Sequence, residues 1–327
     1  MIRTPICDLL GIEHPILLAG MGGVSYSAVT AAVSEAGGLG CLGAAGMDLE
    51  EMRREIRTVK ARTHKPFGVD LLTASPRDQT RFVEAICTDG AKVFVAGLGV
   101  PAKVVDLCHR NGVLVINMCG KVSHAIRAVE AGCDIVVAQG TEAGGHTGQI
   151  ATLPLVPLIV DAVEVPVLAA GGIFDGRGLV AALALGAQGI WMGTRFIAST
   201  EARAHPRYKE KIVEIDETGT VITRCYSGKT MRAIRTRYTD EWEGKRDEIQ
   251  PFPMQAARAT QDGVWHTLVG PEAGLDPERD CMPAGQSAGG ITAVKPCREI
   301  VADILSQAET LLAALPRPNG TCAPSGT

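Results

Sequence analysis

Three features are absent from this chain of 327 residues, and each absence excludes a class of protein. No segment reaches about 18 uninterrupted apolar residues, so a membrane-spanning helix is not expected. No run of lysine and arginine is interleaved with aromatic residues, so nothing favours nucleic-acid binding. Residues 1–8 lack a charged stretch followed by an apolar one, so a secretory signal is not expected.

The ten cysteines are scattered, and no two of them form a Cys-x-x-Cys pair. Without a secretory signal, they are expected to be buried free thiols of a cytoplasmic protein. No histidine stands at metal-ligand spacing from cysteine, aspartate or glutamate, so the sequence predicts no metal site. With 46% hydrophobic residues and a net charge of −4, the chain is long and apolar enough for one large core.

What the chain does contain is a recurring local pattern, in which a helical stretch ends in a small residue plus glycine and a short β-branched run follows. The pattern occurs at 34–43, 87–97, 108–117, 129–139 and 183–193. Three further apolar runs follow prolines, at 15–20, 66–72 and 166–172. Eight short strands that alternate with helices predict a (β/α)8 TIM barrel, an α/β fold. A doubly wound sheet is the alternative.

The regular pattern stops near Phe196, and residues 200–284 are polar and richer in Trp, Tyr and Arg. We expect this segment to be a mostly helical insertion over the barrel mouth, serving as a lid or a wall of the substrate site. Solvated helical faces would explain its charges equally well. Residues 1–199 and 285–312 would form the barrel, and 313–327 would be a disordered tail.

Active sites of such barrels lie at the C-terminal ends of the strands, and the loops after strands seven and eight often bind phosphate. Gly171 and Gly172 follow the seventh predicted strand, and Gly193 and Thr194 follow the eighth. Their backbone amides and one hydroxyl predict a phosphorylated ligand. Arg195 either adds positive charge there or points outward.

The ends of strands one and six are also glycine-rich. Met21, Gly22 and Gly23 follow the first strand, and Gly144 and Gly145 follow the sixth. Backbone without side chains allows a flat ring system to approach closely, although ordinary loop glycines would explain each site taken alone. A ring together with a phosphate indicates flavin mononucleotide (FMN).

His146 directly follows the doubled glycine of the stretch 138–148. Imidazole is the usual general base near neutral pH, and beside a redox ring it could transfer a proton while the ring takes electrons. The alternative is a histidine that only hydrogen-bonds a carbonyl at the barrel mouth. Glu142 could be a second acid or base, but binding to loop amides is favoured.

The stretches 19–23, 67–72, 138–148, 169–196 and 285–290 resemble the nitronate monooxygenases, which are FMN-dependent barrels. The resemblance implies oxidation of alkyl nitronates or nitroalkanes by dioxygen to a carbonyl compound and nitrite, in a monomer or homodimer. It makes His146 the catalytic residue. It makes the flavin contacts Met21, Gly22, Gly23, Asp70, Gln139, Gly144 and Gly145, and the phosphate contacts Gly171, Gly172, Gly193 and Thr194.

Two departures from that family bear on the substrate. Asp70 replaces an asparagine, and its carboxylate would disfavour an anionic nitronate unless it is protonated or turned toward the ribityl chain. Met118 stands where some relatives carry a lysine. The same motifs occur in flavin-dependent enoyl-thioester reductases and in acyl-CoA relatives. An NAD(P)H-dependent reductase or dehydrogenase of acyl thioesters is therefore the alternative, and Arg232, Arg235 and Arg237 could then contact a CoA phosphate.

A flavin-free lyase or isomerase that binds a sugar phosphate in the same loops is a third reading. It is disfavoured because no lysine is expected at a strand end to form a Schiff base, and few carboxylates are.

Overall fold

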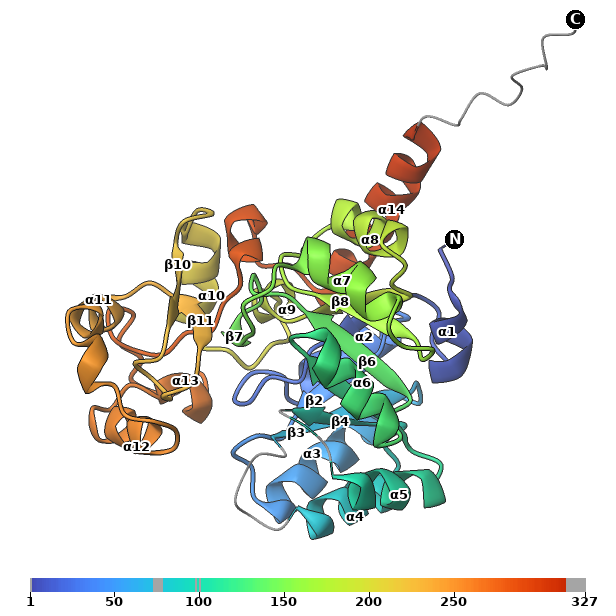
Figure 1. Cartoon of the computed structure of the whole chain (residues 1–327), viewed down its shortest axis with the longest axis horizontal. Coiled ribbons are helices and arrows are strands. Elements are labelled where there is room, and N and C mark those ends of the chain that lie inside the picture. The colour runs from blue at the N-terminus through green and yellow to red at the C-terminus, as the bar shows by residue number, and fades with distance from the viewer. Residues whose placement is uncertain (1, 73–78, 98, 100, 316–327) are drawn as a thin grey trace, which may run out of the picture.

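The computed structural model describes residues 2–72, 79–97, 99 and 101–315, and within them eight parallel strands form one sheet (Figure 1). The sheet order is β1-β9-β8-β6-β5-β4-β3-β2, and a parallel bridge between Leu17 and Leu39 brings its two edges together. The fold is therefore the predicted (β/α)8 barrel and not a doubly wound sheet. The barrel strands are β1 Ile16–Leu18, β2 Gly40–Gly43, β3 Phe67–Leu72, β4 Val93–Gly97, β5 Leu114–Cys119, β6 Ile135–Gln139, β8 Val167–Ala170 and β9 Gly189–Met192.

Helices alternate with these strands and surround the sheet. After a short α1, Pro5–Leu10, they are α2 Ser27–Glu35, α3 Leu49–Arg62, α4 Thr80–Asp89, α5 Ala102–Arg110, α6 Val122–Glu130, α7 Thr152–Val160, α8 Gly176–Ala184 and the one-turn α9 Thr194–Ile197. The eighth barrel helix comes from the C-terminal part of the chain, since α14 packs against α8 and α2. The segment before α14 therefore interrupts the last β/α unit.

Glycine at the helix ends accounts for the regularity of the sequence pattern. Gly90 has φ +97° and Gly132 has φ +95°, a left-handed conformation that costs other residues free energy and that ends a helix.

Alternate residues of each strand pack on opposite sides of the barrel wall. Leu18 packs with the surrounding helices, whereas Leu17 packs in the interior with Ile6 and Leu10 of α1. The strands are buried on both faces, as their continuous apolar runs indicate.

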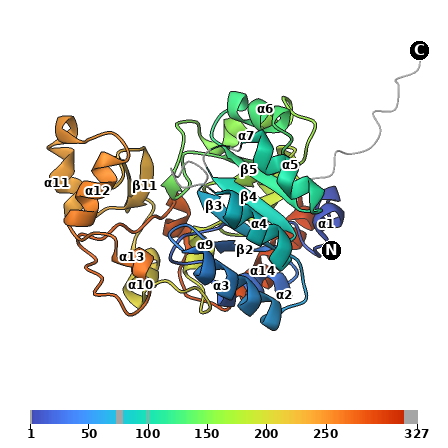
Figure 2. The ribbon, with the colours of Figure 1, turned by 90° about the horizontal axis from the view of Figure 1, so that it is seen from below.

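The segment predicted as an insertion forms a second, smaller body beside the barrel (Figures 1 and 2). Its elements are α10 Pro206–Glu214, β10 Thr220–Thr223, β11 Met231–Ile234, α11 Arg237–Glu243, η1 Arg246–Glu248, α12 Met254–Gln261 and α13 His266–Val269. Its own core contains Tyr226, Tyr238 and Trp242. Tyr226 and Tyr238 stack with ring centroids 5.2 Å apart.

A three-stranded antiparallel sheet, which the sequence did not indicate, joins the insertion to the barrel. Strand β11 pairs with β10 on one side and with β7, Gly145–His146, on the other. β7 belongs to the loop after β6, so the stretch that carries His146 is an edge strand of the insertion's sheet. The chain returns to the barrel through η2, Gln286–Gly290.

The longest helix, α14, spans Cys297–Ala314 and extends two residues past the predicted boundary of the barrel at 312. The rest of the predicted tail, 316–327, lies outside the described residues. Neither α14 nor another helix among the described residues combines the length and apolar character that a membrane crossing needs.

Candidate active site

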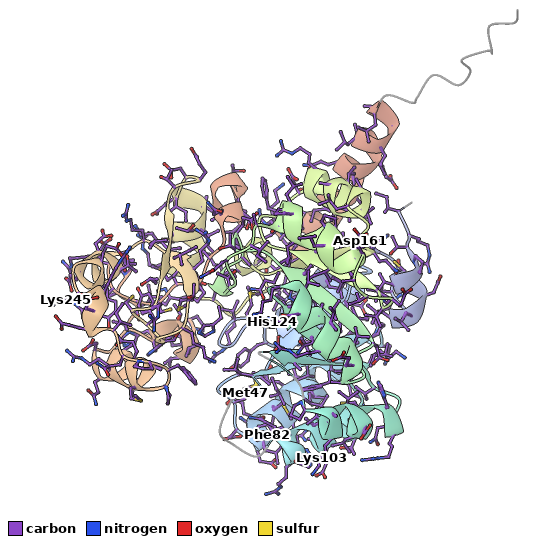
Figure 3. The ribbon with its side chains drawn as sticks, in the orientation of Figure 1. Met47, Phe82, Lys103, His124, Asp161 and Lys245 are labelled. Carbon is purple, nitrogen blue, oxygen red and sulfur yellow. The ribbon has the colours of Figure 1, made fainter. Side chains whose placement is uncertain are left out.

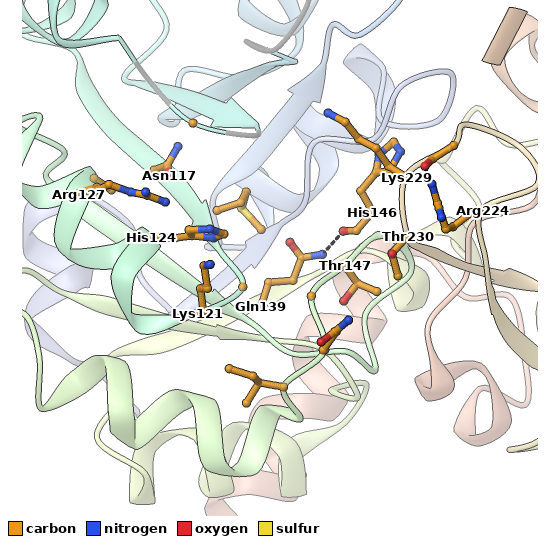
Figure 4. A pocket seen from close by; sticks show the side chains of 18 residues that line it. Asn117, Lys121, His124, Arg127, Gln139, His146, Thr147, Arg224, Lys229 and Thr230 are labelled. Atoms are coloured by element: carbon orange, nitrogen blue, oxygen red, sulfur yellow. Dashed lines mark hydrogen bonds between the residues drawn. The ribbon is translucent and has the colours of Figure 1, made fainter. Parts of the chain in front are cut away.

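A cavity of about 1040 Å³ lies at the C-terminal ends of the barrel strands, between the barrel and the insertion (Figure 4). Asn117, Met118 and Gln139 line it from the strands, and residues 224 and 228–230 line it from the insertion. Figure 3 shows His124 on the barrel side of this region, whereas Lys245 lies on the side of the insertion away from the barrel. Of the residues predicted for the site, Gln139 and His146 line this cavity.

His146 is held at the cavity by three contacts. The amide of Gln139 donates to the His146 carbonyl at 2.9 Å, and β11 pairs with its backbone at Met231. The imidazole Nε2 lies 2.9 Å from the Ser227 hydroxyl, so its ring partner is a side chain of the insertion and not a mouth carbonyl. Burial, and secondarily the charge of Lys229, lowers the pKa of His146 below its ordinary value. The half-buried ring is therefore neutral near pH 7, the state that a base needs.

Glu142 has the structural role that the sequence favoured. Both of its carboxylate oxygens accept from the Thr152 amide, at 3.0 and 2.9 Å, and one also accepts from the Thr152 hydroxyl. The carboxylate thus ties the loop after β6 to the start of α7. Arg195 is also structural: it is buried and donates to the carbonyls of Ala198 and Ala293, both at 2.7 Å. It neither points outward nor enters the predicted phosphate loops.

Most of the glycines predicted to make room for a flavin also make room for other parts of the chain. A Cβ on Gly144 would lie 2.7 Å from the Ala284 carbonyl carbon, and one on Gly23 would lie 2.6 Å from the Thr267 carbonyl oxygen. Chain packing thus requires glycine at these two positions, and Gly22 and Gly171 are similarly confined, by Ala45 and Thr152. The packing of the chain explains these glycines without a ligand. Their contact with a flavin stays a prediction.

Gly145 and Gly172 are different, because a Cβ on either would meet little. Nothing lies within 4 Å of the Gly145 position, and the nearest atom to the Gly172 position is Glu142 Cβ at 3.6 Å. Gly172 has φ +74° and directly follows Gly171 at φ +104°, so both residues are in the left-handed region that favours glycine. Open space beside bare backbone is what a flavin and its phosphate need, so these strand ends fit FMN.

Gly193 and Thr194 complete the predicted phosphate loops. Gly193 precedes α9, and Thr194 is its first residue, so the Thr194 amide has no partner within the helix. The Thr194 hydroxyl accepts from the Gly285 amide at 2.9 Å and keeps its own proton to donate. This hydrogen bond links the motif at 285–290 to the loop after β9.

Four cations surround the cavity, and the sequence analysis did not select them. Lys121 and Arg127 are exposed on the barrel side, Arg224 is exposed on the insertion, and Lys229 is half-buried there. No aspartate or glutamate is among the described residues that line the cavity, and no described carboxylate forms an ion pair with these four side chains. Lys229 stacks instead on Phe252, 4.5 Å from the ring centroid. The cavity therefore has a positive rim, and the part of the chain that the structure describes provides no counter-charge to it.

The arginines that the sequence suggested for a CoA phosphate lie elsewhere. Arg232 is buried and donates to the Thr141 carbonyl at 2.9 Å, which supports the loop before His146. Arg235 and Arg237 are exposed and pair with carboxylates of α11, Asp240 and Glu241. None of the three lines the cavity.

Lys121 also changes two expectations drawn from the sequence. It stands two residues beyond β5, where no lysine was expected at a strand end. Lys121 and Met118 line the same cavity. Lys121 therefore supplies a positive charge in place of the lysine that some relatives carry at position 118. The sequence signal was available, since the first residues after a barrel strand belong to the mouth.

The geometry of the barrel and its mouth can be compared with known proteins. The family model described as "Nitronate monooxygenase" matches residues 3–82 and 75–307. A probable nitronate monooxygenase of Staphylococcus aureus is 30% identical, over 95% of this chain and 98% of that protein. The solved structure of FabK from Thermotoga maritima is 39% identical with a TM-score of 0.88, over 96% of this chain and 98% of that one.

A second group of similar proteins is named for another substrate. A Mycobacterium tuberculosis protein named (3aS,4S,5R,7aS)-5-hydroxy-7a-methyl-1-oxo-octahydro-1H-indene-4-carboxyl-CoA dehydrogenase is 34% identical, over 95% of this chain and 97% of that protein. The family model covers most of the chain, and these relatives cover nearly all of it. The chain therefore belongs to the nitronate monooxygenase family of flavin-dependent oxidoreductases.

Proposed function

We propose that this enzyme binds FMN and reduces or oxidises an acyl thioester of a phosphorylated carrier such as coenzyme A. NAD(P)H would be the electron donor for the reduction, and NAD(P)+ the electron acceptor for the oxidation. The observation that carries the proposal is the cavity: it is large, four cations surround it, and no described carboxylate lines it. A small nitronate needs one positive partner, whereas the phosphates of a CoA-like carrier need several. The 34% identity to a protein named as a carboxyl-CoA dehydrogenase supports the same substrate class.

Each part of the site has a role in this proposal. The bound flavin supplies hydride chemistry at the barrel mouth. Exposed Lys121, Arg127 and Arg224 bind phosphates at the rim, where water still reaches them. His146, half-buried and neutral, takes or returns the proton on carbon next to the thioester carbonyl. Its bond to Ser227 keeps the ring oriented.

Oxidation of alkyl nitronates is the second candidate, because one observation favours it as well. The neutral imidazole of His146 can deprotonate a nitroalkane, and the positive charge of Lys121 and Lys229 in the same cavity can hold the resulting anion. A probable nitronate monooxygenase at 30% identity supports this reading. Both candidates use the same base and the same flavin.

Anaerobic mixing distinguishes the two candidates. We expect the visible absorbance of the oxidised flavin to disappear with NADH or NADPH and to return on addition of an enoyl-CoA, or to disappear with a saturated acyl-CoA alone. Propyl-2-nitronate should leave the flavin oxidised on the same timescale. Rapid bleaching by the nitronate, with no response to thioesters or nicotinamides, would establish nitronate oxidation instead.

Removal of positive charge at the rim should weaken thioester binding selectively. We expect Lys121→Gln combined with Arg127→Gln to raise KM for an acyl-CoA by about 10²- to 10⁴-fold, because each of the two charged hydrogen bonds to phosphate contributes about 1.5–3 kcal/mol. The KM for the same acyl group on pantetheine, which lacks phosphate, should stay unchanged. Arg235→Gln with Arg237→Gln is the matched control, since both arginines lie outside the cavity. Equal effects of the two pairs would contradict the placement of the phosphates.

A further inference from the structure

Asp70 is a half-buried side chain at the barrel mouth, and the described residues provide its carboxyl group with no hydrogen-bond partner. It lies inside β3 and not after it, between Gly43 of β2 and Val95 of β4. Its side chain crosses toward the loop after β1: a Cβ on Gly20 would lie 2.1 Å from Asp70 Cβ and 2.7 Å from Oδ2. On the other side, a Cβ on Gly97 would lie 3.7 Å from Oδ1. The absence of a side chain at Gly20 therefore leaves room for the Asp70 carboxyl beside residues 21–23, the loop that is proposed to contact the flavin.

Two other carboxylates, the buried Asp280 and the half-buried Glu142, show what the half-buried Asp70 lacks. Asp280, which is fully buried, accepts from the amides of His266 and Asp276 and from the His266 ring. Glu142 accepts from the amide and hydroxyl of Thr152. Among the described residues no donor reaches the Asp70 carboxyl and no cation neutralises it. An ionised carboxylate without protein donors is costly wherever water is excluded from it, as beneath a bound ligand, whereas a protonated one is not.

The surroundings of Asp70 contain one other titratable side chain among the described residues, Cys41 on β2. Burial raises the pKa of the Cys41 thiol well above its ordinary range, so this group stays neutral. The residues of β4, Val93–Gly97, and of the loop 19–23 carry no charge. The partial burial of Asp70, which no charged neighbour among the described residues offsets, therefore raises its pKa to about 8.

We propose that Asp70 carries its proton in the working enzyme and donates a hydrogen bond to the bound flavin, so that it adjusts how readily the flavin is reduced. The neutral acid offers an O–H donor, which favours electron density on the ring, as an asparagine amide would. Once ionised, the same group would place a negative charge beside the ring and disfavour reduction. Asp70 thus combines the donor of an amide with a dependence on pH that an amide lacks. The inference rests on the proposed flavin site, but not on either substrate.

The test compares the reduction potential of the bound flavin in wild type, Asp70→Asn and Asp70→Ala, by equilibration of each holoenzyme with redox dyes across pH. Below the transition near pH 8, wild type and Asp70→Asn should have the same potential, and Asp70→Ala a lower one because it lacks a donor. Above the transition, the wild-type potential should fall below that of Asp70→Asn. Cys41→Ser should follow wild type throughout.

The outcomes separate the inference from the function on which it rests. An Asp70→Asn potential above wild type at every pH would show that the carboxylate is already ionised and would overturn the inference. Identical profiles in all three proteins would also overturn it, by showing that Asp70 does not reach the flavin. If the wild type binds no flavin at all, measured first by absorbance of the purified protein, the proposed function fails and the inference fails with it.

Discussion

Replacement of His146 by alanine should lower turnover by about 10²–10⁴-fold while the flavin stays bound, the range expected when a general base is removed. The structure supports this separation, because the His146 ring contacts Ser227 and lines the cavity, whereas Gly171, Gly172 and Gly193 are not among its lining residues. Steady-state kinetics with a thioester, or with a neutral nitroalkane, and the flavin content of the purified variant give the two readouts. Unchanged turnover would remove His146 from the reaction.

The pH profile provides a second readout for the same residue. Because burial lowers the pKa of His146, the neutral base persists to a pH below its ordinary value of 6.5. Turnover should therefore rise with pH through a value below 6.5 and stay level up to the transition of Asp70 near pH 8, and this rise should vanish in His146→Ala. Ser227→Ala is the matched control, since it removes the ring's partner but keeps the base. A rise that survives in His146→Ala belongs to another group.

The barrel could be predicted from the sequence because each β/α unit carries its own local signals. Glycines such as Gly90 and Gly132 take the left-handed conformation at helix ends, and apolar runs follow them within a few residues. These signals do not depend on distant contacts. The small sheet of the insertion could not be predicted in this way, because β7 has only two residues and exists through pairing with β11, more than 80 residues later.

The site was predictable where its residues follow a strand end and less so where packing competes with function. His146 was selected because a histidine within a glycine-rich mouth loop is unusual; it lines the cavity, and its catalytic role stays a prediction. Gly144 was assigned to the flavin, yet the approach of the chain at Ala284 already requires a glycine there. A glycine in the sequence can make room either for a ligand or for another segment of the chain, and the sequence alone does not show which. In the structure, Gly145 and Gly172 are the two of these glycines with open space beside them.

The positive rim was missed for a related reason. Cationic residues are common on surfaces, and the sequence does not show which of them lack a carboxylate partner. Arg235 and Arg237 stand in the most charged part of the chain, but Asp240 and Glu241 pair with them. Lys121 stands outside the charged stretches, two residues after a strand end, and lines the cavity. Pairing depends on the tertiary structure, and it changes which charges can bind a substrate.

Gly172→Val should lower the affinity for FMN by about 10- to 100-fold, because the loss of even one charged hydrogen bond from the amide backbone to phosphate has that effect. A valine Cβ would enter the open space that the structure leaves at Gly172. Titration of the apoprotein with FMN, followed by quenching of flavin fluorescence, measures the affinity. Riboflavin lacks the phosphate, so the preference of the wild type for FMN over riboflavin should shrink in the variant.

Backbone strain must be separated from loss of the phosphate site in this experiment. Valine at φ +74° costs about 1–3 kcal/mol whatever surrounds it. Gly112 provides the control, since it has φ +69°, lies at the end of α5, and has nothing within 4 Å of its Cβ position. Gly112→Val should lower the melting temperature to a similar degree and keep the full affinity for FMN. Full flavin occupancy in Gly172→Val, or equal loss in both variants, would move the phosphate away from the loop after β8.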